Sequence, residues 1–347
     1  MNLPIPLDYA PAEAETLAEL PEGPEWQYEP KWDGFRCLAF RDGGEVDLRS
    51  KAGKPLGRYF PDLLERLAAL SANRFVLDGE IVVPVGGGLS FDELQLRLHP
   101  AASRVQKLAA AYPATFVAFD LLLGPRGNPI TDRPLRERRE RLEDFAGRFF
   151  PAKEGARLSP CTCEAAEARK WLASGDEGLD GVMAKRVDLP YQSGERTGMV
   201  KVKNLRSADC VVGGYRYAQK GERIVGSLLL GLYGADGLLH HVGFCSAIPR
   251  DDRRELTPRL EALRGGPGFT GSAPGGPSRW SAMSGRSSEW EPLRTELVVE
   301  VAYDAFTSGR FRHGTRFLRW RPDKAPEQCR MEQVARESAA ALRLLRH

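Results

Sequence analysis

The pattern of hydrophobic and polar positions changes near residue 204 and divides the chain into two regions. In the first region, short apolar runs and amphipathic stretches follow one another irregularly, which predicts strands mixed with helices. The strands are expected at residues 35–40, 45–49, 74–85 and 115–123, and the helices at 61–70, after Ser90, at 134–147 and at 164–174. Because no regular βαβ order appears, we expect a mainly antiparallel α+β domain rather than a doubly wound sheet.

The second region consists of short strand-like runs that are separated by turns containing glycine. Five such runs are expected, at residues 209–217, 225–233, 238–246, 295–303 and 316–321. Five short strands are typical of a small barrel, most commonly an OB-fold. A segment rich in Gly, Pro and Ser at 265–288 is interpreted as a flexible loop inside this domain, and apolar positions within 327–345 predict a C-terminal helix. The expected domains are therefore residues 1–203 and residues 204–347.

Composition and charge exclude several classes of protein. The 347 residues include 50 Lys and Arg and 47 Asp and Glu, so any basic surface must be local. Residues 305–325 form such a cluster, with six Lys or Arg and one acid. No apolar run approaches the roughly 20 residues of a membrane helix, and six cysteines are too few for a disulfide scaffold. We therefore expect a cytoplasmic protein without a membrane partner.

The residues that carry candidate chemistry lie outside the common cofactor signatures, because P-loop, dinucleotide-binding, zinc-peptidase and serine-hydrolase motifs are absent. Residues 29–36 instead read Glu-Pro-Lys-Trp-Asp-Gly-Phe-Arg. Pro30 favours extended backbone, in which Glu29, Lys31 and Asp33 share one face. A lysine among apolar and cationic neighbours can lose its proton and act as a nucleophile. An ordinary solvated lysine explains this segment equally well when it is taken alone.

Further candidates are two lysines, two acids and one aromatic ring. Lys201 and Lys203 lie on one face of a predicted strand, and such a pair suits stabilisation of phosphate charge. Asp180 and Glu80 stand at strand margins, where carboxylates could serve a Mg²⁺ bound to a triphosphate. Taken one at a time, a polar strand face, two turn acids and a core position for Phe119 are the simpler interpretations.

Seven segments, taken together and in order, resemble the motifs of the covalent nucleotidyltransferases, namely ATP-dependent DNA ligases, RNA ligases and mRNA capping enzymes. The segments are Lys31-x-Asp33-Gly34-x-Arg36, Arg49-Ser50-Lys51-x-Gly53, Leu77-Asp78-Gly79-Glu80, Phe119-Asp120-Leu121-Leu122, Asp180-Gly181-Val182-Met183-Ala184-Lys185, Val200-Lys201-Val202-Lys203 and Arg321-Pro322-Asp323-Lys324. The series spans nearly the whole chain. With the arginine-rich helix at 133–141, it is similar to small bacterial DNA ligases. This resemblance implies a nucleotidyltransferase (ATP-grasp-like) adenylation domain followed by an OB-fold domain.

The resemblance also implies a role for each matching residue. Lys31 is implied to be the nucleophile that becomes lysyl-AMP, with Lys201 and Lys203 beside the α-phosphate. The implied nucleotide contacts are Glu29 at the adenine edge, Phe119 stacked on the base, Arg36 and Glu80 at the ribose, Arg49 at a phosphate, and Arg321 and Lys324 at the leaving pyrophosphate. Asp180 is implied to hold the metal. The family usually has glutamate at this position, and Glu177 is the other candidate.

The function implied by the resemblance is that of an ATP-dependent DNA ligase that seals nicks in duplex DNA, in repair. We expect ATP and Mg²⁺ (or Mn²⁺) as cofactors and nicked double-stranded DNA as the partner. We also expect a bacterial, nucleoid-associated monomer that meets repair or end-joining proteins. Two alternatives stay open: an RNA ligase or capping-type enzyme, and a non-catalytic OB-fold nucleic-acid binder. A covalent adduct formed from ATP would distinguish the enzymes from the binder.

Overall fold

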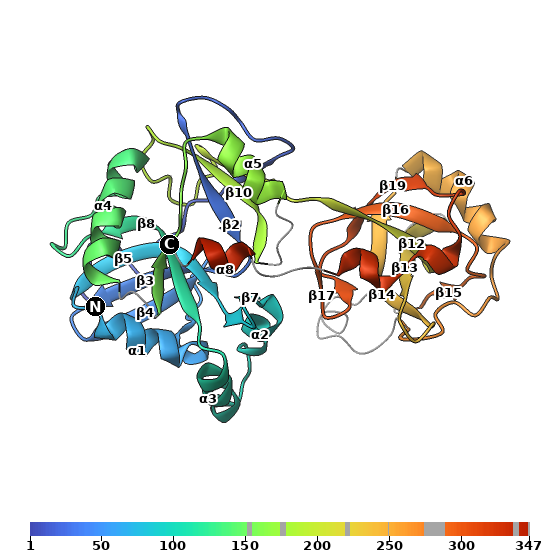
Figure 1. Cartoon of the computed structure of the whole chain (residues 1–347), viewed down its shortest axis with the longest axis horizontal. Helices are drawn as coiled ribbons and strands as arrows, with labels where there is room; N and C mark the ends of the chain where they lie inside the picture. The colour runs from blue at the N-terminus through green and yellow to red at the C-terminus, as the bar shows by residue number, and fades with distance from the viewer. Residues whose placement is uncertain are drawn as a thin grey trace. The chain divides into compact units, whose positions relative to one another are not determined.

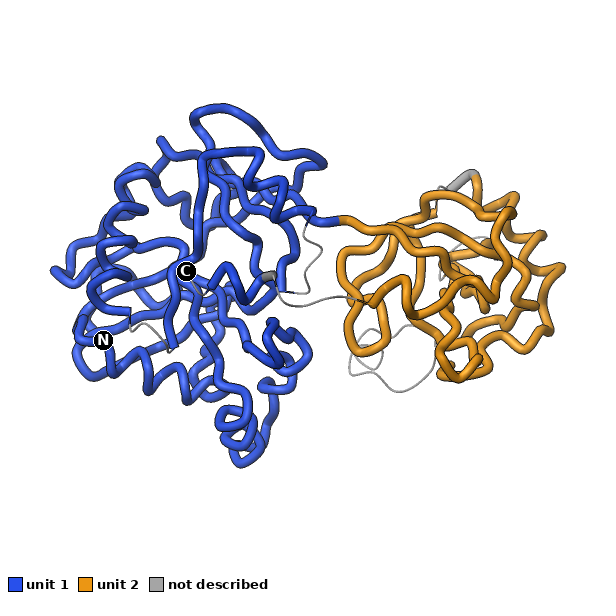
Figure 2. The backbone as a smooth tube through the Cα atoms, in the orientation of Figure 1, with its two compact units in different colours: residues 1–204, 336–347 blue, residues 205–335 orange. Residues whose placement is uncertain are grey.

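The computed structural model describes residues 1–150, 155–173, 178–218, 223–248, 250–273, 289–335 and 340–345. The chain forms two compact units (Figure 2). The first unit comprises residues 1–204 and 336–347, and the second comprises residues 205–335. Within the described ranges, no helix is long and apolar enough to cross a membrane.

The first unit contains two main sheets, which are nearly all antiparallel (Figure 1). The five-stranded sheet has the order β4 (Glu45–Ser50), β3 (Phe35–Asp42), β5 (Arg74–Val82), β8 (Thr115–Leu123) and β9 (Ala156–Leu158). The four-stranded sheet has the order β1 (Glu15–Leu17), β11 (Met199–Lys203), β10 (Leu179–Arg186) and β2 (Trp26–Trp32). In the described part of this unit, the parallel pairs are β1–β11 and β8–β9. The expected mainly antiparallel α+β domain is confirmed.

Helices cover these sheets through their apolar faces. The helical elements are η1 (Gly57–Tyr59), α1 (Pro61–Ala69), α2 (Phe91–Leu96), α3 (Ala102–Ala111), α4 (Leu135–Phe149) and α5 (Ala165–Ala173), and β6 (Pro84–Val85) with β7 (Gly88–Leu89) forms a small hairpin. Leu67 of α1 and Leu142 of α4 pack in one core with Leu77 of the five-stranded sheet. Trp171 of α5 packs with Val182 of the four-stranded sheet. As predicted, Ser90 caps α2, since its hydroxyl accepts a hydrogen bond from the Glu93 N–H.

The second unit is a small barrel whose main strand pairs are antiparallel apart from β14–β19, which is parallel. Its main strands are β12 (Arg206–Tyr217), β13 (Val225–Tyr233), β14 (Leu239–Ala247), β16 (Val298–Tyr303) and β19 (Thr315–Trp320). The sheet order β13-β14-β19-β16-β12 closes on itself because β12 also pairs with β13. The other elements are α6 (Arg250–Glu261), β15 (Glu291–Pro292), β17 (Phe306–Thr307), β18 (Arg310–Phe311), η2 (Pro326–Gln328) and η3 (Met331–Val334). The strand count and order agree with the expected five-stranded OB-fold.

The predicted C-terminal helix over 327–345 is wrong. The structure has the short turns η2 and η3 and then α8 (Ala340–Leu344). Val334 packs in the barrel core, whereas Ala341 and Leu345 pack beside Trp32 in the first unit. The apolar positions therefore serve two different cores, and α8 belongs to the first unit rather than to the OB-fold domain.

The predicted loop at 265–288 is only partly described. Residues 274–288 lie outside the described residues. In the part that is described, Phe269 packs into the barrel core and lies next to the ring of Trp290, with 5.5 Å between the ring centroids.

Candidate active site

Lys31 lies near the end of β2, where that strand pairs with β10 and Gly181 is the register partner of Lys31. Lys31 Nζ donates a hydrogen bond to Asp180 Oδ2, and the two side chains are only 22% and 13% exposed. Burial lowers the pKa of Lys31, but the negative charge of Asp180 and its hydrogen bond to Lys31 outweigh burial and leave the pKa raised. Lys31 is therefore held as an ammonium, and it must lose a proton before it can act as a nucleophile.

Gly181 allows β10 to approach β11 unusually closely. Its φ is +142°, and a Cβ atom at this position would lie 2.1 Å from the carbonyl oxygen of Val202. Only glycine fits this backbone and this space. Lys31 on β2 and Lys203 on β11 are both register partners of Gly181, so the close approach brings these two lysines to the same part of the sheet.

Lys201 and Lys203 share one face of β11, as the alternating pattern predicts, and Val200 and Val202 on the opposite face are buried. The pKa of Lys201 is lowered by burial and then by the positive charges of Lys31 and Lys203. Three ammonium groups therefore act on one another at this site. Such a concentration of positive charge favours a ligand that carries several negative charges.

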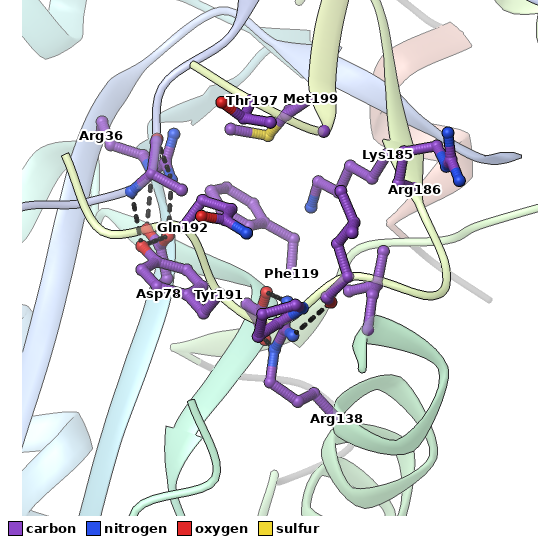
Figure 3. Close-up of a pocket in the computed structure, with 16 residues that line it drawn as sticks. Arg36, Asp78, Phe119, Arg138, Lys185, Arg186, Tyr191, Gln192, Thr197 and Met199 are labelled. Carbon is purple, nitrogen blue, oxygen red and sulfur yellow. Dashed lines mark hydrogen bonds and ion pairs between the residues drawn. The ribbon is translucent and has the colours of Figure 1, made fainter. Parts of the chain in front are cut away.

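A recess in the first unit is lined by the Phe119 ring (Figure 3). Arg36 Cζ is 4.7 Å and Lys185 Nζ is 4.5 Å from the ring centroid, so two cations lie over this aromatic side chain. Arg36 is held by Asp78 through two hydrogen bonds of 2.6 and 2.5 Å, and the Tyr191 hydroxyl donates to Asp78 at 2.6 Å. The interpretation of Phe119 as an ordinary core residue is wrong, because its ring is partly exposed and lines the recess.

Glu29 is almost completely buried and binds Lys185, the residue whose Nζ lies over the Phe119 ring. Lys185 Nζ donates to one of its oxygens at 2.8 Å, and Gln27 Nε2 donates to the other at 2.8 Å. The carboxylate is therefore positioned by two donors on neighbouring strands, as a buried charge requires.

Glu80 is paired in register with Arg36, on β5 and β3. Burial raises the pKa of Glu80 to about 8, and the positive charges of Lys31 and Arg36 offset only part of this effect. A carboxyl group with this pKa carries a proton near neutral pH and can donate a hydrogen bond.

Three of the candidate residues are paired with other carboxylates. Arg49 on β4 pairs with Asp47 at 2.6 Å. Arg321 and Lys324 belong to the second unit, where both bind Asp209. The structure thus brings together Lys31, Lys201, Lys203 and Asp180. Arg36 and Phe119 line a recess, Glu29 binds Lys185 of that recess, and Glu80 is the register partner of Arg36.

The sequence reasoning missed several residues that hold the recess in shape. Asp120 accepts two hydrogen bonds of 2.9 Å from Arg138, whose guanidinium also donates to the Leu189 carbonyl oxygen at 3.2 Å. These contacts connect the strand of Phe119 to the segment that carries Tyr191. Asp120 and Arg138 did stand in recognised motifs, whereas nothing in the sequence around Tyr191 marked it.

The described residues contain no group of three or more His, Cys, Asp or Glu that could hold a metal ion by itself. Mg²⁺ in nucleotide enzymes commonly needs only one or two carboxylates in addition to the phosphates of the substrate. Asp180 fits this requirement because its carboxylate faces Lys31. Glu177, the other candidate, lies outside the described residues.

Comparison with known families identifies the chain. The ATP dependent DNA ligase domain matches residues 10–203, and the ATP dependent DNA ligase C terminal region matches residues 221–324. The chain belongs to the family of ATP-dependent DNA ligases. It is an enzyme that uses ATP and seals nicks in DNA, as the motifs implied, which argues against the RNA ligase or capping-type alternative and against the non-catalytic binder.

Individual relatives agree with this assignment. DNA ligase C of Mycobacterium tuberculosis is 42% identical, over 99% of this chain and 98% of the relative. The multifunctional non-homologous end joining DNA repair protein LigD of the same species is 31% identical over 88% of this chain, but only 37% of LigD is covered. A solved structure from a study of Lig E DNA ligases covers 90% of this chain and 99% of that chain at 16% identity, with a TM-score of 0.54, which supports the fold alone.

Proposed function

We propose that Lys31 is the residue that takes AMP from ATP. The observation that carries this proposal is the position of Lys31, which shares Gly181 as a register partner with Lys203 and binds Asp180. An unpaired surface lysine would have none of these neighbours. The concentration of cations around Nζ is what an attack on a polyphosphate requires.

The reaction then proceeds through three transfers that share this site. Neutral Lys31 Nζ attacks the α-phosphorus of ATP, the bond to the bridging oxygen breaks, and pyrophosphate leaves. The AMP next passes from Lys31 to the 5′-phosphate at the nick, and finally the 3′-hydroxyl attacks that phosphate and AMP leaves. Covalent catalysis divides one difficult condensation into steps that each have a good leaving group. Lys201 and Lys203 stabilise the charge on the α-phosphate during these transfers.

The recess around Phe119 is proposed to hold the nucleoside. An adenine base stacks on the Phe119 ring in place of the cations that now cover it. Glu29 accepts a hydrogen bond from the adenine amino group after Lys185 yields one of its oxygens. Arg36 and the protonated carboxyl of Glu80 bind the ribose hydroxyls, since they are register partners at the edge of the recess.

Asp180 is proposed to bind Mg²⁺ (or Mn²⁺) together with the phosphates of ATP. The metal, when bound, withdraws charge from the phosphate oxygens and makes the α-phosphorus easier to attack. Asp180 also orients Lys31 through their hydrogen bond. A metal ion bound to Asp180 would weaken the attraction of this carboxylate for the ammonium group and so make it easier for Lys31 to lose its proton.

Arg49 is proposed to bind the 5′-phosphate of the nick or the AMP phosphate, and Arg321 and Lys324 are proposed to orient the pyrophosphate. One relative is named a DNA ligase, and another is named a non-homologous end joining DNA repair protein. We therefore propose that the reaction serves repair in the nucleoid, with end-joining proteins as partners.

Incubation of the purified chain with ATP labelled at the α-phosphate tests the proposal. Wild-type protein is expected to form a covalent AMP adduct, and Lys31→Ala is expected to form none while still sealing a nick that was adenylated in advance. Lys203→Ala should bind ATP but lose most of the adduct. An adduct that persists in Lys31→Ala would show that another residue is the nucleophile.

A further inference from the structure

One carboxylate in the second unit holds both cations that the proposed function assigns to the pyrophosphate. Arg321 Nη1 donates to the two oxygens of Asp209 at 2.9 and 3.1 Å, and Lys324 Nζ donates to Asp209 Oδ2 at 2.6 Å. The Asp209 side chain is only 11% exposed, and those of Arg321 and Lys324 are 19% and 24% exposed. Partial burial makes such charge-assisted hydrogen bonds stronger than those of a fully solvated pair.

Asp209 is itself rigidly placed. It lies on β12, where Glu300 of β16 is its register partner. Its backbone N–H donates to Gln333 Oε1, and its carbonyl oxygen accepts from Gln333 Nε2, both at 2.9 Å. The carboxylate therefore projects from a barrel strand that is paired on one side and bound by a side-chain amide on the other.

The guanidinium of Arg321 is fully occupied between two acids. Its Nε and Nη2 donate to Asp323 at 3.0 and 2.8 Å, which leaves Nη1 for Asp209. The hydrogen bonds from Arg321 lower the pKa of Asp323 to about 2. Asp323 is part of the same short segment and moves with it, whereas Asp209 comes from a strand 112 residues away in the sequence. Asp209 is therefore a side-chain contact that connects this segment to a distant barrel strand, in addition to the hydrogen bond of 2.9 Å from the Arg321 N–H to the Val298 carbonyl oxygen.

We propose that Asp209 is a positioning residue, which presents Arg321 and Lys324 in one geometry to the pyrophosphate that leaves during lysine adenylation. This inference rests on the proposed function of those two cations. In that step the bond between Lys31 Nζ and the α-phosphorus forms, and the bond to the bridging oxygen breaks with its electron pair on pyrophosphate. The proton that Lys31 loses passes to solvent. Asp209 touches no reacting atom and acts through the two cations.

The direction of the effect distinguishes positioning from competition. If Asp209 only competed with phosphate for the cations, removal of its charge would speed lysine adenylation. If Asp209 positions them, its loss allows the Arg321 and Lys324 side chains to adopt many rotamers. Fixing these side chains again during lysine adenylation costs free energy, which slows the step. Sealing of a nick that is already adenylated releases no pyrophosphate, so positioning predicts an effect on the first step alone.

The experiment compares Asp209→Asn with wild type in two single-turnover assays on the full chain. One assay follows lysine adenylation with labelled ATP, and the other follows sealing of a pre-adenylated nick without ATP. Asp209→Asn is expected to slow adenylation at least tenfold and to change sealing less than twofold. Asp209→Glu, which keeps the charge, should recover part of the adenylation rate. Glu291→Gln is the control, because it removes the charge of another carboxylate of the second unit, one that binds Arg264 at 2.7 Å, and it should adenylate like wild type.

A double-mutant test adds a readout that loss of folding cannot imitate. In a chain that carries Arg321→Ala and Lys324→Ala, the further change Asp209→Asn should alter adenylation less than twofold, because its two partners are gone. Wild-type or faster adenylation by Asp209→Asn overturns the inference, and so does an equal loss in both assays. Failure of wild type to form any adduct would instead overturn the proposed function.

Discussion

The ion pairs around the recess of the first unit and the Arg319 pair of the second unit lie in different environments. In the first unit, Arg36 is bound by Asp78, whose side chain is 0% exposed, and Lys185 is bound by Glu29, whose side chain is 2% exposed. In the second unit, Arg319 is 65% exposed although Glu300 binds it at 2.6 Å. Buried pairs are hardly screened by salt, whereas exposed pairs are screened and are individually weak.

This difference indicates what each unit contributes. In the first unit, buried charged side chains are held by partners on neighbouring strands. Substitutions that move the backbone or change a protonation state there should alter both the rate of adenylation and the free energy of unfolding. The second unit keeps exposed basic side chains such as Arg319, which can leave a carboxylate partner and bind a phosphate instead. Substitutions there should change binding by small, salt-dependent amounts. The predictions below test this division, beginning with the largest expected effect.

Gly181→Ala should have the largest effect. The new Cβ would lie 2.1 Å from the Val202 carbonyl oxygen at a φ of +142°, so β10 and β11 must separate. We expect a loss of stability of about 3 kcal/mol and a fall in lysine adenylation of about 100-fold, since small displacements of reacting groups are costly. Thermal unfolding and the adduct assay measure the two effects.

Gly237→Ala in the second unit is the matched control for that substitution. Gly237 also has a positive φ, +75°, but a Cβ there would meet nothing within 4 Å. It should cost about 1 kcal/mol and leave lysine adenylation unchanged. Equal effects of the two substitutions would mean that the close approach of β10 to β11 has no special importance.

Phe119→Ala should weaken the use of ATP by about tenfold, because stacking on an aromatic ring contributes about 1–3 kcal/mol per base. The loss should appear as a raised KM for ATP in the adenylation assay. Phe119→Trp, which keeps an aromatic face, should retain most of the affinity. An unchanged KM in Phe119→Ala would remove Phe119 from the nucleotide site and leave its ring a partner of Arg36 and Lys185 only.

Glu80→Gln should change how stability depends on pH. The pKa of Glu80 is about 8 in the folded chain and near 4.5 when the group is free, so the folded protein keeps a proton that the unfolded chain releases between these values. Wild type therefore loses stability as the pH rises from about 5 to 8. Glutamine cannot titrate, so the variant lacks this loss. The free energy of unfolding of the variant minus that of wild type should therefore be about 2 kcal/mol larger at pH 8.5 than at pH 5.

Urea unfolding at the two pH values measures this difference. Glu65→Gln, at an exposed position of α1, provides the control and should show no comparable change with pH. If Glu80→Gln and wild type have parallel stability curves, the Glu80 carboxyl is ionised in the folded state over this range and its burial is compensated by Lys31 and Arg36.

Sequence reasoning predicted the strand positions of Lys31, Lys201 and Lys203, but not the residues that shape the neighbouring recess. The motif order and the period of two placed Lys201 and Lys203 on one face, because alternation is a local property of a strand. The hydrogen bond from Tyr191 to Asp78 joins residues 113 positions apart. No local pattern in a single sequence indicates that two residues so far apart along the chain are in contact, so the shape of the recess could not be predicted.

The fold shows the same division between local and distant information. The helix α6 was missed, because it is rich in charge and contains Pro258, although Leu256 and Leu260 pack in the barrel core at a helical spacing. The predicted C-terminal helix was too long. The helical spacing of apolar residues continues through 327–345, but Val334 packs in the barrel core, whereas Ala341 and Leu345 pack in the first unit. Periodicity shows that a face is buried but not against which partner.

The smallest effect is expected from Arg316→Ala on the barrel. Arg316 is exposed and has no hydrogen bond or ion pair among the described residues, whereas Arg319, three positions away on β19, is bound by Glu300. If the basic cluster at 305–325 binds the DNA backbone, the unpaired cation should release more counterions than the paired one. Arg316→Ala should weaken binding to nicked duplex about threefold and reduce the slope of log K against log salt by about 1, and Arg319→Ala should change the slope less. Titrations at several salt concentrations measure both slopes; identical slopes for the two variants would mean that the acids of the second unit do not decide which of its cations meet DNA.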